Sequence, residues 1–190
     1  MMRSNAFQRW VKCIPSLVIT SLMLGCTGQY RAETAYPWYE GQGSNLENCG
    51  PATAAMAVKW AGGQSGVAYA KAVTRKSGWW LYEDIAQHLS QQGLPNELVP
   101  ATSVYRILSK NQSVITRIKV VGVPHYVFIS DYSRGKALLA DPLQGNKRIP
   151  ISAIRAMMTD DTILAIRSES VFPAAHLRQE PKLLKTAFTP

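Results

Sequence analysis

The stretch NLENCGPATAAMAVKW, residues 45–60, predicts a buried helix with a cysteine at its start. Apolar residues fill nearly every turn of residues 50–61, which is typical of a helix that is covered on most sides. Pro51 suits a first helical turn, where its missing N–H costs nothing, and Asn48 is a suitable N-cap. Because a helix N-terminus favours negative charge, Cys49 stands where a thiolate is stabilised.

The composition indicates a globular domain and excludes several kinds of partner. Of the 190 residues, 46% are hydrophobic and 17% are charged, so the chain is able to bury a proper core. The net charge of +9 is spread along the chain without a dense basic block, so no nucleic-acid partner is expected. The histidines and cysteines lack metal-ligand spacing and no phosphate-binding loop follows a strand, so neither a metal nor a cofactor is expected.

Residues 1–25 predict a secretory signal peptide, because a basic segment precedes an apolar run that is too short to span a bilayer comfortably. The sequence LMLGC, which ends at Cys26, resembles the bacterial lipobox, although Met23 stands where leucine is usual. This resemblance implies that Cys26 receives a diacylglycerol anchor and becomes the new N-terminus. Thr27, where an aspartate retains lipoproteins at the inner membrane, implies the outer membrane facing the periplasm of a bacterial cell envelope.

Cys49 is then the one thiol left without an assignment. Cys13 leaves with the signal peptide and Cys26 carries the lipid, so the predicted mature domain has no second cysteine for a disulfide. A lone thiol in an exported protein indicates either a reactive group or an inert buried cysteine that acts as a small hydrophobe.

The hydrophobic pattern predicts an α+β fold in which helices come first and an antiparallel sheet follows. The expected helices are residues 50–61, 67–76, 81–92 and 101–110, and the expected strands are 113–122, 125–132, 137–142, 147–152 and 162–168, with a helical turn at 153–158. The strands are expected to form a meander. The predicted organisation is a tether at 26–36, one folded domain at 37–168 and a loosely ordered tail at 169–190.

A thiolate nucleophile needs a base, and the base needs an orienting group. His125 begins a strand, whereas His88 lies on a helix that is expected at the surface and His176 lies in the tail. Asp141 ends the next strand, and adjacent antiparallel strands joined by a short turn place it at the same end of the sheet as His125. Asp131 lies at the far end of the strand from His125 and is expected to be a turn residue.

Gln42 is the candidate for the remaining catalytic group, a hydrogen-bond donor to an oxyanion. It precedes Cys49 by seven residues, so its amide and the backbone N–H of Cys49 are able to flank a carbonyl oxygen. Gln64 and Asn45 are less well placed. The alternative for Gln42 is a glutamine in a solvated loop. Trp79, Trp80 and Tyr82 fit the core better than the lining of a cleft.

The order of Gln42, CGP at Cys49, HY at His125 and DP at Asp141 resembles the papain-like peptidase family that removes double-glycine leaders from bacteriocin precursors, especially its stand-alone relatives. The resemblance covers about residues 35–168. It implies a papain-like fold whose central nucleophile helix packs on an antiparallel sheet. It also makes Cys49 the nucleophile, His125 the general base and acid, Asp141 the orienter and Gln42 the oxyanion donor.

These observations predict a lipid-anchored cysteine peptidase of the cell envelope, which cleaves a peptide bond of a peptide or protein substrate through a thioester on Cys49. One alternative is a papain-like peptidoglycan amidase, endopeptidase or acyl transferase, although the cell-wall enzymes usually show CSG where this chain has CGP. Another is a non-enzymatic assembly module that retains a peptidase shell. The membrane is expected as a partner through Cys26, and the resemblance does not specify the substrate.

Overall fold

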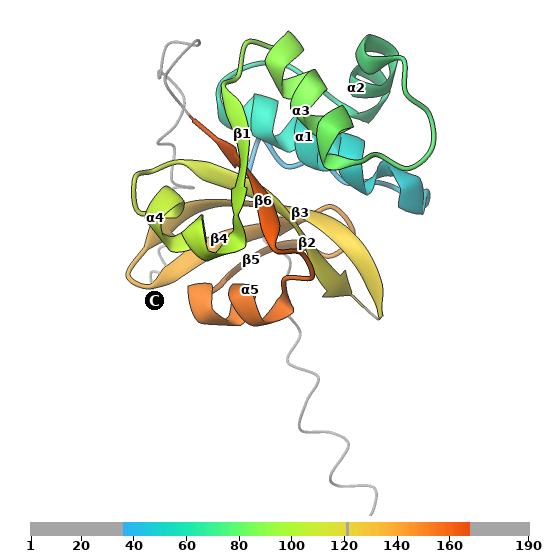
Figure 1. Ribbon diagram of the computed structural model, residues 1–190. Coiled ribbons are helices and arrows are strands. Elements are labelled where there is room, and N and C mark those ends of the chain that lie inside the picture. Colours follow the sequence, from blue (N-terminus) through green and yellow to red (C-terminus); the bar gives the residue numbers. More distant parts are fainter. Residues whose placement is uncertain (1–35, 121, 168–190) are drawn as a thin grey trace, which may run out of the picture. The chain divides into compact units, whose positions relative to one another are not determined.

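A six-stranded antiparallel sheet forms the centre of the protein, and helices cover both of its faces (Figure 1). The computed structural model describes residues 36–120 and 122–167. The strands follow the order β1-β6-β2-β3-β4-β5. Their bounds are β1 Asn96–Pro100, β2 Ser113–Val120, β3 Val123–Ser133, β4 Lys136–Asp141, β5 Gly145–Pro150 and β6 Thr162–Ile166. The helices are α1 Cys49–Trp60, α2 Val67–Thr74, α3 Tyr82–Gln91, α4 Val104–Leu108 and α5 Ile151–Met157, and two 3-10 turns are η1 Leu46–Asn48 and η2 Ala101–Ser103.

One face of the sheet packs against α1 and α3. Phe128 of β3 is fully buried there, and its ring meets Trp60 of α1 edge-on with 5.9 Å between ring centroids. The small side chains of α1 are buried along almost its whole length, which explains why its sequence is apolar in every turn. The same layer contains Met56, Ile85, Leu89, Ile115, Leu164 and Ile166.

The opposite face packs against the two short helices α4 and α5. Val127 and Ile129 alternate with Phe128 along β3 and point to this second layer, since successive side chains of a strand face opposite sides. Burial on both faces makes β3 read as a continuous apolar run instead of an alternating one. The other members of this layer include Val104, Ile107, Leu108, Val114, Leu139, Ile154 and Ile163.

The predicted α+β class is confirmed, but the sheet is not the expected meander. The strands β2 to β5 do pair in sequence order, whereas β6 returns across the sheet and lies between β1 and β2. The prediction missed β1 altogether, because NELVP is short, offers two adjacent apolar residues and ends in proline. The helix expected at 101–110 is a 3-10 turn followed by the five residues of α4.

Some predictions fall outside the described residues: the signal peptide at 1–25, the lipid site Cys26, most of the tether, His176 and the tail at 169–190. No helix within the described part of the chain is long and apolar enough to cross a membrane.

Candidate active site

Cys49 is the first residue of α1 and is 2% exposed. The turn η1 runs directly into α1, so Asn48 has helical backbone angles and its side chain does not cap α1. This corrects the sequence expectation. The capping side chain belongs to Asn45, whose Oδ1 accepts from the N–H of Glu47 and caps η1.

Trp80 packs directly on the first turn of α1, next to Cys49. A Cβ atom placed on Gly50 would lie 2.6 Å from Cβ of Trp80, so only glycine fits this contact. Trp80 is 2% exposed and Tyr82 is also buried, in agreement with the expectation that they belong to the core. Trp79 differs, because it is 53% exposed.

His125 and Asp141 form a buried pair at one end of the sheet. Nε2 of His125 lies 2.8 Å from Oδ1 of Asp141, and the two residues come from the start of β3 and the end of β4. A two-residue turn joins these strands, with Arg134 and Gly135 both at positive φ, the conformation of a type I′ hairpin. A β-bulge between Ser130 and Ser133 then shifts the register by one residue, so the turn and the bulge together set the pairing that brings the imidazole to the carboxylate.

Backbone groups around Asp141 fix its carboxylate and its main chain. Oδ1 also accepts hydrogen bonds from the N–H groups of Leu143 and Gln144, at 2.8 and 3.1 Å. The phenol of Tyr39 donates to the backbone oxygen of Asp141 at 3.0 Å. An acceptor that is held in this way keeps the imidazole of His125 in one orientation.

The pKa values of the pair shift in opposite directions. Burial lowers the pKa of His125, but its hydrogen bonds to Asp141 and Cys49 and the charges of both partners outweigh burial and raise this pKa from 6.5 to about 9. Burial raises the pKa of Asp141, but the hydrogen bond and charge of His125, with the two backbone N–H groups, hold it below its usual value. The pair is therefore an imidazolium with a carboxylate at neutral pH.

Because Nε2 of His125 is engaged by Asp141, Nδ1 is the ring nitrogen left for the thiol of Cys49. The candidate nucleophile, base and orienter thus come together from α1, β3 and β4. This order of contacts, thiol to imidazole to carboxylate, is what nucleophilic catalysis by cysteine requires.

Gln42 lies in the extended segment before η1 and is 2% exposed. Its backbone is held at both ends: the N–H donates to the oxygen of Pro142 at 3.0 Å, and the oxygen accepts from Nδ2 of Asn48 at 3.1 Å. Its side-chain amide is buried without a hydrogen-bond partner among the described residues. A buried amide with free N–H groups, beside the segment that carries Asp141, is suited to receive an oxyanion.

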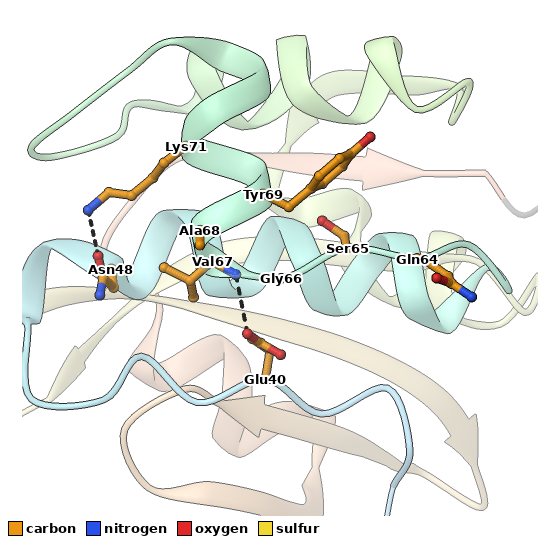
Figure 2. A pocket seen from close by; sticks show the side chains of 9 residues that line it. All are labelled: Glu40, Asn48, Gln64, Ser65, Gly66, Val67, Ala68, Tyr69 and Lys71. Carbon is orange, nitrogen blue, oxygen red and sulfur yellow. Dashed lines mark hydrogen bonds between the residues drawn. The ribbon is translucent and has the colours of Figure 1, made fainter.

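The competing candidates lie elsewhere. Asn45 is exposed and serves η1, whereas Asp131 is exposed on β3, where its carboxylate accepts from Ser130. Gln64 borders an open hollow between α2 and the segment before α1, which is lined by Glu40, Asn48, Gln64, Ser65, Gly66, Val67, Ala68, Tyr69 and Lys71 (Figure 2). The hollow includes neither Cys49 nor His125, so it is adjacent to the reactive groups and separate from them.

His88 is buried, which corrects the expectation of a surface position. It packs between the rings of Tyr69 and Trp80, and its Nε2 lies 3.2 Å from Oγ of Ser65. Burial lowers the pKa of His88 to about 4, so its ring is neutral at physiological pH. The polar residues Gln87 and Ser90 nearby made the sequence around His88 look like an exposed helix face, so the burial of His88 was not predicted. Within the described residues, no cluster of three or more His, Cys, Asp or Glu side chains could hold a metal ion.

The supporting roles of Tyr39 and Asn48 at the candidate site were not predicted from the sequence. Both act through contacts with residues distant in the chain or through an unexpected side-chain direction. Tyr39, three residues before Gln42, belongs to no recognisable motif. For Asn48 the local preference for a helix cap pointed to the wrong partner.

The fold that carries this arrangement matches that of solved peptidase domains. The peptidase domain of Streptococcus ComA, a bi-functional ABC transporter involved in a quorum sensing pathway, superposes with a TM-score of 0.55 at 16% identity, over 67% of this chain and 97% of that domain. A double glycine motif protease from an AMS/PCAT transporter, solved in complex with the leader peptide, gives a TM-score of 0.54 at 18% identity, over 72% of this chain and 94% of the other. No protein-family model and no curated protein sequence matches the chain. At such identities the likeness establishes the fold.

Proposed function

We propose that this protein is a cysteine peptidase in which Cys49 is the nucleophile. The observation that carries the proposal is the buried His125–Asp141 hydrogen bond beside Cys49, together with the unpartnered amide of Gln42. A purely structural role leaves this amide unexplained, because a buried polar group without a partner destabilises the fold by about 1–3 kcal/mol.

Acylation begins when the sulfur of Cys49 attacks the peptide carbonyl carbon. The thiol proton resides on Nδ1 of His125, the carbonyl electron pair moves onto oxygen, and Gln42 with the N–H of Cys49 donates to that oxygen. The tetrahedral intermediate collapses as the C–N bond breaks and His125 gives its proton to the departing amine. The product at this stage is a thioester on Cys49.

Hydrolysis completes the cycle with the same groups. His125, now neutral, takes a proton from water as the water oxygen attacks the thioester carbon. The second intermediate collapses with cleavage of the C–S bond, which releases the carboxylic acid and restores the thiolate beside the imidazolium of His125. The acid then loses its proton to water and leaves as the carboxylate. Asp141 holds the ring in one orientation through both steps, since Oδ1 is itself fixed by two backbone N–H groups.

A slender segment of substrate fits this site best. Cys49 and Gln42 are each only 2% exposed, so the scissile carbonyl has to reach groups that lie almost beneath the surface. Glycine on either side of the bond minimises the obstruction. One of the similar structures is described as a double glycine motif protease, and a peptide with a Gly-Gly site is therefore the first substrate to test.

The decisive experiment combines two measurements on the purified protein. Hydrolysis of a fluorogenic peptide that ends in Gly-Gly reports turnover, and the rate of alkylation by iodoacetamide at pH 6–7 reports the state of the thiol. We expect turnover that Cys49→Ala abolishes, and alkylation of Cys49 that is faster than that of free cysteine. The change Lys110→Met, at an exposed position after α4, is a control that preserves both.

Alkylation no faster than that of free cysteine would contradict the activated thiolate. Release of soluble fragments from purified sacculi, in place of peptide cleavage, would favour the cell-wall amidase. A Cys49→Ala variant that fully complements a deletion strain would favour the non-enzymatic module.

The proposal also places the peptidase on the cell envelope. The support is the signal-like segment of residues 1–25 and the lipobox-like sequence that ends at Cys26, followed by Thr27. Diacylglycerol on this cysteine would hold the catalytic domain at the membrane surface by its acyl chains, each buried methylene contributing about 0.8 kcal/mol. The outer membrane facing the periplasm is the location that Thr27 favours.

A further inference from the structure

The side chain of Asn48 bridges two elements next to the candidate active site. Its Nδ2 donates to the backbone oxygen of Gln42 at 3.1 Å, and its Oδ1 accepts from Nζ of Lys71 on α2 at 2.8 Å. Figure 2 shows the second of these bonds, with Lys71 extending from α2 toward Asn48. The result is a hydrogen-bonded chain that runs from α2, through Asn48, to the backbone of Gln42.

Lys71 helps to determine which way the side-chain amide of Asn48 faces. An ammonium group only donates hydrogen bonds, so Oδ1 of Asn48 turns toward Lys71 and Nδ2 turns toward the oxygen of Gln42. The oxygen of Gln42 favours the same orientation, and Lys71 adds a second bond that holds the amide in it. The flipped amide would set its own oxygen against the oxygen of Gln42, and two acceptors facing each other cannot bond.

The bridge matters because of where its two ends lie. Asn48 directly precedes Cys49, whose backbone N–H is one proposed oxyanion donor, and it holds Gln42, whose side-chain amide is the other. Two donors stabilise one oxyanion only when both lie about 2.7–3.1 Å from it, and small displacements weaken catalysis strongly. A bond between Asn48 and Gln42 therefore fixes the spacing of the donors.

Other contacts hold the rest of the same segment but not this spacing. Glu40 is paired with Lys59 of α1 at 2.6 Å and accepts from the N–H of Val67 at 3.2 Å. The N–H of Gln42 donates to Pro142, beside Asp141. These bonds hold the segment against α1, α2 and the end of β4. The bond from Asn48, by contrast, links Gln42 to the residue that directly precedes Cys49.

We propose that Asn48 and Lys71 are positioning residues that hold the oxyanion donor Gln42 in register with Cys49. This inference rests on the proposed peptidase function and adds α2 to the machinery of that site. The two residues act on the stabilisation of the transition state and leave formation of the thiolate to His125.

The test uses Lys71→Met, which keeps the aliphatic stem and removes the amine, with Lys71→Arg as the conservative variant and Lys110→Met as a charge-matched control. On the Gly-Gly fluorogenic peptide, Lys71→Met is expected to lower kcat about tenfold with KM unchanged, part of the 10²–10³ that loss of a whole donor causes. Its rate of Cys49 alkylation is expected to equal the wild-type rate, because alkylation forms no oxyanion. Lys71→Arg is expected to recover kcat to within about twofold.

Asn48→Leu gives a second test, because it removes both bonds of the bridge. It is expected to lower kcat at least as far as Lys71→Met, and the double variant is expected to lose no more than Asn48→Leu alone, since the two residues act in one chain. Affinity for a peptide aldehyde ending in glycinal, whose adduct oxygen occupies the same position as the oxyanion, is expected to fall in parallel with kcat.

Several results would overturn the positioning role: wild-type kcat in Lys71→Met, a parallel fall in the alkylation rate, or a Lys71→Arg variant as slow as Lys71→Met. If the wild-type protein neither hydrolyses the peptide nor binds the aldehyde, the proposed peptidase function itself is contradicted. This outcome differs from failure of the positioning role, because it is seen in the wild-type protein before any variant is compared.

Discussion

At the scale of single residues, the His125–Asp141 pair links stability to pH. The folded-state pKa of His125 is raised from 6.5 to about 9, so its stabilising contribution is complete below about pH 6.5 and disappears as the pH rises through 9. Asp141 has a lowered pKa, so its contribution persists throughout this range. We therefore predict that the free energy of unfolding of the wild-type protein falls between pH 6.5 and 9, as measured by urea denaturation.

Asp141→Asn is the matched variant for this measurement. It removes the carboxylate that raises the pKa of His125, so the stability of the variant is expected to vary less with pH over the same interval. Parallel curves for the two proteins would show that the pair does not carry the pH dependence.

Gln42 offers a separate prediction, in which activity and stability move in opposite directions. Gln42→Leu replaces a buried, unpartnered amide by an apolar group of similar size. We expect kcat to fall by 10²–10³ through loss of an oxyanion donor, and the free energy of unfolding to rise by about 1 kcal/mol. Peptide hydrolysis and urea denaturation measure the two effects. A variant that loses stability together with activity would indicate a structural role for this amide.

At the scale of elements, the contact between α1 and Trp80 leaves no space for a side chain. Alanine at an internal helical position is normally more stable than glycine by about 0.5–1 kcal/mol. At Gly50 the new Cβ would lie 2.6 Å from Cβ of Trp80, so Gly50→Ala is expected to destabilise the protein by about 1–3 kcal/mol. Gly41→Ala, where a Cβ finds only ordinary contacts from 3.7 Å upward, is the control for thermal unfolding. A variant at Gly50 as stable as the wild type would show that Trp80 moves without penalty.

A residue better suited to positive φ is expected to stabilise the turn between β3 and β4. Arg134 has φ of 50°, in the left-handed region that a non-glycine residue adopts with strain, and Gly135 follows at 78°. Asn-Gly is the preferred pair for such a type I′ turn. We predict that Arg134→Asn raises the free energy of unfolding by about 0.5–1 kcal/mol and leaves hydrolysis of the Gly-Gly peptide unchanged. A lower melting temperature would contradict this reading of the turn.

At the scale of the whole molecule, membrane attachment is predicted to depend on one cysteine. Metabolic labelling with an alkyne fatty acid is expected to modify the wild-type protein and not Cys26→Ser, and the variant is expected to leave the membrane fraction. Cys49→Ala, which keeps the lipobox-like sequence, is expected to label as the wild type does. Equal labelling of wild type and Cys26→Ser would exclude this anchor.

Local patterns predicted much of this architecture, and contacts distant in the chain account for what they missed. Cys49, His125 and Asp141 could be grouped from sequence because a helix start, a strand start and a strand end are each local features, and the β3–β4 hairpin brings the last two together. β1 escaped because its partner β6 lies more than sixty residues later. The role of Asn48 was not predicted because its side chain bonds to Lys71 of α2 and does not cap the helix that it precedes.

The place of β6 in the sheet has a consequence for how the protein is made. A ribosome releases β1 long before β6, yet β6 is the strand with which β1 pairs among the described residues. Residues 96–100 therefore have no strand partner until residues 162–166 emerge, and the sheet stays incomplete during most of the synthesis of the chain. The proposed signal peptide would direct the chain through a secretion pore. Late pairing of β1 with β6 would keep the chain unfolded during this passage, so that the domain folds after export.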